Sequence, residues 1–109
     1  MPPAGGDIVK NPPLTPTELE LVRSVFRLHP EVQTATLFGS RAKGTHSPRS
    51  DVDLAITGSV SALRAETIAS ELEELPLPYR FDVQALDQIR FKPLLEHIQR
   101  VGLQIYPAA

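Results

Sequence analysis

Apolar positions recur every three to four residues after Thr15, which indicates an amphipathic helix. Thr15 can act as the N-cap, Pro16 occupies the first helical position, and Glu18 completes a capping box. We expect Pro30 to end this helix, because the residue before a proline avoids the α region. The positions with helical spacing are Leu19, Val22, Val25, Phe26 and His29.

Other segments show the alternation or the β-branched composition of strands. The clearest is 51–57, where Val52, Leu54 and Ile56 share one face of the strand. Two further helices are expected, each with an apolar stripe, and the first of these stripes contains Ala65, Ile68, Ala69 and Leu72. The remaining expected strands are 33–38, 79–86 and 103–106, and the two helices are 61–75 and 91–101.

The elements therefore follow one another in the order α-β-β-α-β-α-β. This order predicts an α+β domain in which helices pack on a mixed β-sheet. A polar loop, 39–50, separates the first two strands and is expected to contain at most one helical turn. Residues 1–14 contain four prolines and two glycines without periodicity, and we expect them to form a flexible tail that precedes a single domain at 15–109.

Composition excludes several classes of function. The chain has 109 residues, a net charge of −2 and no cysteine, which excludes disulfides and thiol catalysis. A mildly acidic chain with 6% aromatic residues argues against general nucleic-acid binding. No apolar run could span a membrane, and the N-terminus lacks a secretion signal, so we expect a cytoplasmic protein with no membrane association.

Two aspartates, Asp51 and Asp53, stand two positions apart at the start of the strand 51–57. Side chains at this spacing point to the same side of a strand, with their Cα atoms about 6.5–7 Å apart. Such carboxylates repel each other unless a cation lies between them, and their oxygens suit Mg²⁺. The alternative is a pair of solvated strand-end side chains. The first interpretation predicts two-metal phosphoryl chemistry with Mg²⁺ or Mn²⁺.

A third carboxylate is expected near this pair, and Asp82 is the best candidate. It lies on the polar face of strand 79–86 between the apolar residues Phe81 and Val83. There it could share a metal ion and accept the proton of an acceptor hydroxyl. Asp87 is the competitor but lies beyond the apolar alternation, and a plain surface role for Asp82 is the alternative.

Gly39-Ser40 follows the strand 33–38 directly and can bind phosphate. Glycine lets the backbone approach a phosphate closely, and the serine hydroxyl can donate a hydrogen bond to it. Ser40 could instead serve only as a helix cap. Three basic residues in the same loop either contact the triphosphate or remain solvated, and these are Arg41, Lys43 and Arg49.

The histidines are spread over three expected elements, which argues against a histidine metal site. His46 lies in the polar loop, where a nucleotide contact is an alternative to a plain loop position. His97 is expected on the exposed side of the last helix.

Gly39-Ser40, ten further residues and Asp51-Val52-Asp53 together match the GS-x10-DxD signature of the DNA polymerase β-like nucleotidyltransferases. The run GSRAKG at 39–44 and the ending at Ile105-Tyr106 are similar to the minimal nucleotidyltransferase (MNT) branch. One departure is Lys43, where arginine is more usual. The resemblance covers about 15–106, nearly all of the expected domain.

This resemblance implies the polymerase β-like nucleotidyltransferase fold and transfer from ATP or another NTP with Mg²⁺. The two motif aspartates and a third strand aspartate would bind the metal. Many MNT proteins resemble antitoxins that pair with a helical HEPN-domain toxin and add AMP to one of its hydroxyl groups. Two alternatives stay open, a non-catalytic antitoxin that covers the toxin and the nucleotide-binding subunit of a two-chain nucleotidyltransferase. Homo- or hetero-oligomers fit either, because ligand sites often form between chains.

Overall fold

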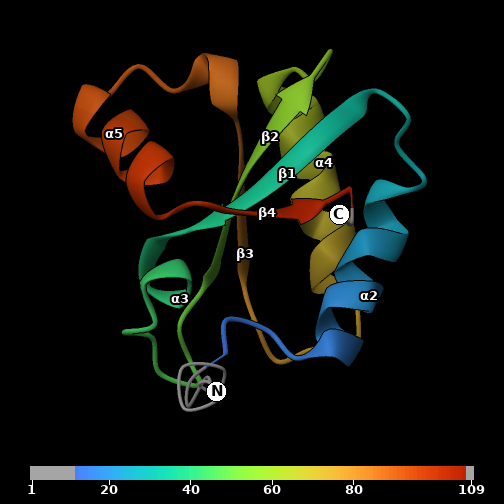
Figure 1. Ribbon diagram of the computed structural model, residues 1–109. Helices are drawn as coiled ribbons and strands as arrows, with labels where there is room; N and C mark the ends of the chain where they lie inside the picture. Colours follow the sequence, from blue (N-terminus) through green and yellow to red (C-terminus); the bar gives the residue numbers. More distant parts are fainter. Residues whose placement is uncertain (1–11, 108–109) are drawn as a thin grey trace.

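A computed structural model describes residues 12–107, so most of the expected tail lies outside the described residues. The centre of the fold is a mixed four-stranded sheet in the order β3-β2-β1-β4 (Figure 1). β1 is antiparallel to both β2 and β4, whereas β2 and β3 are parallel. The α+β class is therefore confirmed. The strands are β1 (Val32–Phe38), β2 (Val52–Gly58), β3 (Phe81–Ala85) and β4 (Leu103–Tyr106).

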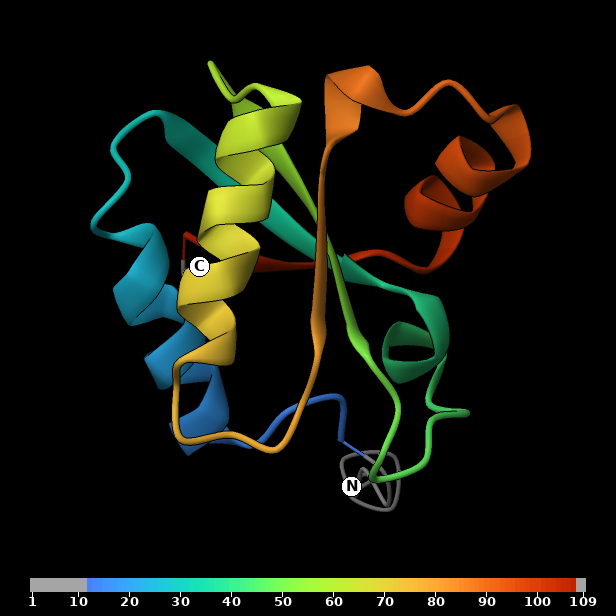
Figure 2. The same ribbon diagram turned by 180° about the vertical axis from the view of Figure 1, so that it is seen from behind.

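Helices cover both faces of the sheet. α2 and α4 lie together on one side, and α3 and α5 lie on the other (Figure 1 and Figure 2). Within residues 12–107, no helix is long and apolar enough to cross a membrane. The helices are α2 (Pro16–Phe26), α3 (Gly39–Lys43), α4 (Ala62–Glu73) and α5 (Lys92–Val101), and a 3₁₀ turn, η1 (Leu86–Gln88), follows β3.

The capping box at the start of α2 is confirmed. The backbone N–H of Glu18 donates to Thr15 Oγ1 at 3.2 Å, and the N–H of Thr15 donates to Glu18 Oε1 at 2.9 Å. α2 ends at Phe26, earlier than expected. Ahead of Pro30, the backbone N–H groups of Leu28 and His29 donate to the carbonyl oxygens three residues before them, as in a 3₁₀ turn. His29 thus lies beyond the helix, where its Nε2 contacts Glu71 Oε1 at 2.7 Å.

The main core fills the space between the sheet and the α2–α4 side. The face of β2 expected to be apolar is fully buried here. Ala65, Ile68 and Leu72 of α4 are also buried, whereas Ala69 is only partly buried. Burial of each large apolar side chain stabilises the fold by about 1.5–3 kcal/mol. A smaller cluster beneath α5 contains Phe38, Ala55, Ile89 and Ile98. The fully buried large side chains of the main core are Val22, Phe26, Leu37, Val52, Leu54, Ile56, Ile68 and Leu72.

The packed part of the chain begins before Thr15, within the expected tail. The start of the last helix also differs from its expected position. Leu14, expected in the tail, is only 4% exposed and belongs to the main core. Phe91 was expected to be the first residue of the last helix, 91–101, but it is the N-cap of α5 and 68% exposed. Gly102 is extended, and a Cβ there would overlap the carbonyl oxygen of Ile98, so close packing explains this glycine.

Candidate active site

The parallel pairing of β2 and β3 places two of the expected carboxylates side by side. Asp53 on β2 and Asp82 on β3 are register partners, and Phe38 at the end of β1 pairs with Asp53 on its other side. Because neighbouring residues on both strands face the main core, the two carboxylates share the opposite face of the sheet. Asp53 is half-buried in the middle of the sheet, and Asp82 is exposed on the edge strand.

The glycine of the Gly39-Ser40 turn packs directly on Asp53. Gly39 follows β1 with a φ of +79°, a conformation that favours glycine. A Cβ at Gly39 would overlap the Oδ2 atom of Asp53. The turn and the carboxylate therefore meet in space, as the sequence motif predicts, and Gly39 is required by both its backbone conformation and this contact.

Electrostatics show that the acidic residues interact. Burial raises the pKa of Asp53 to about 6, and the nearby charges of Asp82 and Asp51 add to the rise, whereas Arg41 opposes it. Asp51 is exposed and precedes β2 by one residue. A divalent cation would relieve this repulsion, because it favours the ionised carboxylates.

The donor set fits a hard divalent cation that substrate oxygens help to bind. Within residues 12–107, no three His, Cys, Asp or Glu side chains form a metal-binding group by themselves. Mg²⁺ commonly takes only one or two carboxylates and completes its octahedron with water and substrate phosphates. The oxygen ligands beside Gly39 match that mode of binding, and Asp51, Asp53 and Asp82 are the residues that would supply them.

Arg41 has a different position from the one expected. Its side chain is buried, at 3% exposure, and its guanidinium donates to the carbonyl oxygens of Pro13 at 3.0 Å and Ser50 at 2.9 Å. The guanidinium also lies over the ring of Tyr79, 4.2 Å from its centroid. Arg41 therefore binds the loop that leads to Asp51 and is not presented to a phosphate.

The other members of the expected phosphate-binding set lie on or near the surface. Ser40 is partly exposed in the first turn of α3, and Lys43 and Arg49 are exposed in and after that helix. These three residues remain available to a triphosphate that approaches the Gly39-Ser40 turn.

His97 contacts the Gly39-Ser40 turn, which the sequence interpretation did not foresee. It was expected on the exposed side of the last helix, but it is partly buried and its Nε2 accepts a hydrogen bond from the Gly39 N–H at 3.0 Å. Its ring meets Phe38 edge-on at 6.2 Å between centroids. A signal was present, because His97 lies three residues after Leu94 and four before Val101, within the apolar stripe of α5.

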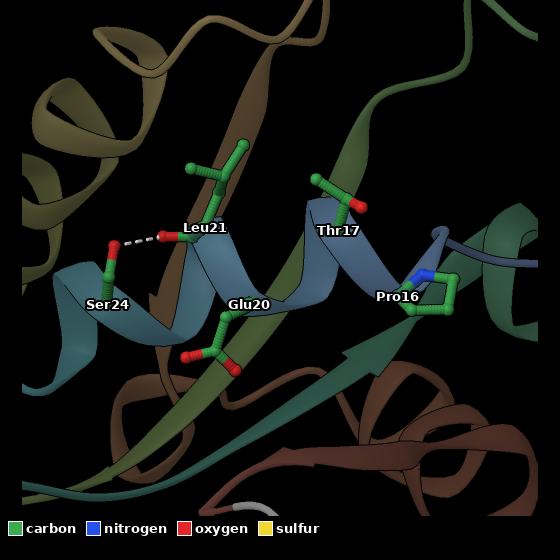
Figure 3. Close-up of a pocket in the computed structure, with 5 residues that line it drawn as sticks. All are labelled: Pro16, Thr17, Glu20, Leu21 and Ser24. Carbon is green, nitrogen blue, oxygen red and sulfur yellow. Dashed lines mark hydrogen bonds between the residues drawn. The ribbon is translucent and has the colours of Figure 1, made fainter.

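A hollow elsewhere on the surface does not contribute to this arrangement. It has a volume of about 470 Å³ and lies on the outer side of α2 (Figure 3). Glu20 is the one carboxylate among its lining residues, so its chemistry differs from that of the sheet face. The lining residues are Pro16, Thr17, Glu20, Leu21 and Ser24.

The mixed sheet, with an in-register carboxylate pair beside a Gly-Ser turn, agrees with the nucleotidyltransferase class. The family model for the polymerase β nucleotidyltransferase domain matches residues 20–108, and the chain belongs to this family. No curated protein matches the chain.

Solved structures share the fold. A chain from a toxin–antitoxin crystal structure with AMP-PNP is 22% identical, with a TM-score of 0.70 over 81% of this chain and 72% of that one. A chain from a complex of a tri-AMPylated Shewanella oneidensis HEPN toxin with its MNT antitoxin is 18% identical, with a TM-score of 0.64 over 83% and 70%. A chain from the MntA–HepT toxin–antitoxin structure is 18% identical, with a TM-score of 0.65 over 84% and 72%. These similarities support the nucleotidyltransferase fold of the chain.

Proposed function

We propose that this protein transfers AMP from ATP to a hydroxyl group of a HEPN-type toxin and so acts as its antitoxin. The in-register pair Asp53 and Asp82, beside Gly39, is the observation that carries the proposal. Family membership supports nucleotidyl transfer. The similar folds come from toxin–antitoxin complexes, one with AMP-PNP and one with a tri-AMPylated toxin, which supports the donor, the acceptor and a hetero-oligomer. An ATP-dependent reaction also fits the expected cytoplasmic location.

The three carboxylates have different roles in the proposed reaction. Asp51, Asp53 and Asp82 would hold two Mg²⁺ ions, or Mn²⁺, which would polarise the α-phosphate and neutralise the leaving pyrophosphate. Asp82 is exposed on the edge strand, where an acceptor hydroxyl can approach. We therefore assign it the role of the base that accepts the proton of this hydroxyl. The acceptor oxygen forms a bond to the α-phosphorus as the bond to the bridging oxygen of pyrophosphate breaks, and pyrophosphate leaves with that electron pair.

The Gly39-Ser40 turn and the loop after it would bind the triphosphate. Gly39 permits the close approach, the Ser40 hydroxyl donates to a phosphate oxygen, and the exposed Lys43 and Arg49 supply positive charge. Arg41 is left out of this set because its guanidinium already binds the backbone of the loop.

Incubation with labelled ATP, Mg²⁺ and the purified HEPN-type partner tests the proposal. We expect label on the partner from the wild-type protein and at least a hundredfold less from Asp53→Asn, since a lost metal ligand removes several kcal/mol of charge stabilisation, on the order of 100-fold or more in rate. Asp87→Asn is the matched control, because Asp87 is exposed in η1 beyond the strand pairing. Undiminished transfer by Asp53→Asn would refute the assigned site.

A second candidate is a nucleotide-binding subunit whose site is completed by another chain. It is favoured by one observation, that no group of three metal ligands is preformed within the described residues. Calorimetry separates the two candidates, because binding of MgATP by the chain alone supports a self-sufficient site and binding only with the partner supports a shared one. Full toxin neutralisation by an Asp51→Asn/Asp53→Asn double variant would instead indicate a non-catalytic antitoxin.

A further inference from the structure

The side chain of His97 connects α5 to the nucleotide-binding turn. Its Nε2 atom accepts the backbone N–H of Gly39 at 3.0 Å, across a sequence separation of 58 residues. The ring of the same histidine stands edge-on to Phe38, the residue before the turn, with an angle of 80° between the two ring planes. Two separate contacts therefore join one side chain to two consecutive residues at the end of β1.

α5 is itself held against the sheet, so it can serve as a fixed support. Ile98, the residue after His97, is buried with Phe38 and Ala55 in the smaller core cluster. Leu94 and Leu95 pack on the same cluster. A peptide that donates a hydrogen bond to a side chain on such a helix is restricted more than one that donates to a mobile loop, because the packed helix keeps its acceptor in place.

The direction of the hydrogen bond determines the protonation of the ring. A backbone N–H can only donate, so Nε2 must present a lone pair, and in the neutral ring the proton is then on Nδ1. Asparagine or glutamine could present an oxygen to the same N–H, whereas phenylalanine or leucine could not.

The contact matters because of where the held peptide lies. Gly39 has a left-handed backbone conformation, and its Cα lies against Asp53 so closely that a Cβ would overlap Oδ2. A shift of this peptide would change both the contact with Asp53 and the direction of the Ser40 hydroxyl. Misplacement of a catalytic group by about 1 Å can cost about a hundredfold in rate.

We infer that His97 is a positioning residue, whose Nε2 holds the Gly39 peptide so that α5 fixes the Gly39-Ser40 turn over Asp53. Because the Gly39 N–H already donates to His97, the Ser40 hydroxyl and the following residues of the turn would make the contacts with phosphate. The kinetic part of this inference rests on the proposed function.

The test compares His97→Phe with His97→Gln in the full chain with its partner. Phenylalanine keeps a ring against Phe38 without an acceptor, whereas glutamine keeps an acceptor without the ring. Gln99→Leu, an exposed position on the same helix, is the matched control. The measurements are kcat, the KM values for NTP and for the partner, the free energy of unfolding, the Gly39 amide exchange rate, and the imidazole tautomer by nitrogen NMR.

For His97→Phe we expect kcat/KM for the NTP to fall roughly ten- to a hundredfold, with the KM for the partner unchanged. His97→Gln should recover most of that loss, and Gly39 amide exchange should be faster in His97→Phe than in the wild type. Equal NTP kinetics in His97→Phe and wild type, or no recovery in His97→Gln, would overturn the inference. So would a neutral ring with its proton on Nε2.

The two proposals fail in different ways. A wild-type protein that transfers no nucleotide to its partner refutes the proposed function, and the exchange and tautomer measurements, which need no turnover, still decide whether His97 holds the turn. An active wild type with an equally active His97→Phe refutes the inference and leaves the proposed function standing.

Discussion

Asp53 and Asp82 face each other as register partners on two parallel strands, and one is half-buried while the other is exposed at the sheet edge. Their different surroundings separate their roles. Burial is the main reason that the pKa of Asp53 rises, and the charge of Asp82 is the next cause. The half-buried carboxylate thus carries the larger cost of ionisation, and the exposed one is the carboxylate to which we have assigned the acceptor's proton.

Replacement of the neighbouring carboxylate should lower the pKa of Asp53. In Asp82→Asn we expect that pKa to fall below its wild-type value of about 6 but to stay above the ordinary 3.8, because burial still acts on the group. Carbon NMR of the labelled side-chain carboxyl over a pH titration, without divalent metal, measures it. Asp87→Asn should leave the titration unchanged, and an equal shift in both variants would contradict the direct interaction.

The pH dependence of stability should carry the sign of a raised carboxyl pKa. Because folded Asp53 holds its proton more tightly than the unfolded chain does, its contribution is fully present below about pH 4 and is lost as pH rises toward 6. As pH rises from about 4 to about 6, we expect the free energy of unfolding of Asp53→Asn to increase by about 1 kcal/mol relative to wild type, after discounting for solvent screening. Urea unfolding at several pH values measures this, and a gain at the acidic end only would show the opposite sign.

Local chemistry in the sequence was enough to predict the strands, the capping box of α2 and the Gly39-Ser40 turn before Asp51 and Asp53. Alternation placed Val52, Leu54 and Ile56 in the core correctly, since a strand has only two faces. The order of the strands was not predictable in this way. Pairing of β2 with β3 joins residues about thirty positions apart, and only the assembled sheet shows that Asp82 stands beside Asp53.

Two side chains were misjudged because their surroundings are made by distant residues. Arg41 looks like a phosphate ligand in a basic loop, yet its guanidinium satisfies carbonyl groups from Pro13 and Ser50 and stacks on Tyr79. His97 was expected on the exposed side of the last helix, yet it lies beside the apolar stripe of α5 and meets the end of β1. Both are polar residues that the fold uses for backbone hydrogen bonds, which a pattern of apolar spacing does not report.

The basic residues of the loop should separate into one structural and two binding residues. Arg41→Lys should lower the free energy of unfolding by about 2–4 kcal/mol, because lysine cannot reproduce the planar set of donors to buried carbonyl groups. Lys43→Gln and Arg49→Gln, at exposed positions, should change stability by less than about 0.5 kcal/mol and raise the KM for NTP a few-fold. Denaturant unfolding and steady-state kinetics measure the two effects, and a stable Arg41→Lys with a raised KM would restore it as a phosphate ligand.

Gly39 and Gly44 allow the strain of a backbone conformation to be separated from the loss of a contact. Both have a left-handed φ, +79° and +81°, so alanine at either position costs about 1–2 kcal/mol of backbone strain. They differ in what a Cβ would meet, which is Asp53 Oδ2 at Gly39 and no atom within 4 Å at Gly44. A larger stability loss in Gly39→Ala than in Gly44→Ala therefore measures the displacement of Asp53.

The same pair should separate stability from catalysis. We expect Gly44→Ala to keep nucleotidyl transfer within about threefold of wild type at a temperature where it is folded, because its strain lies away from the carboxylates. Gly39→Ala should lose about a hundredfold at that temperature, since Asp53 and the turn can no longer occupy their wild-type positions together. Transfer assays on samples shown to be folded by circular dichroism make the comparison. If both variants lose transfer equally, the requirement at Gly39 is one of backbone conformation, and the close approach of the turn to Asp53 has no part in the reaction.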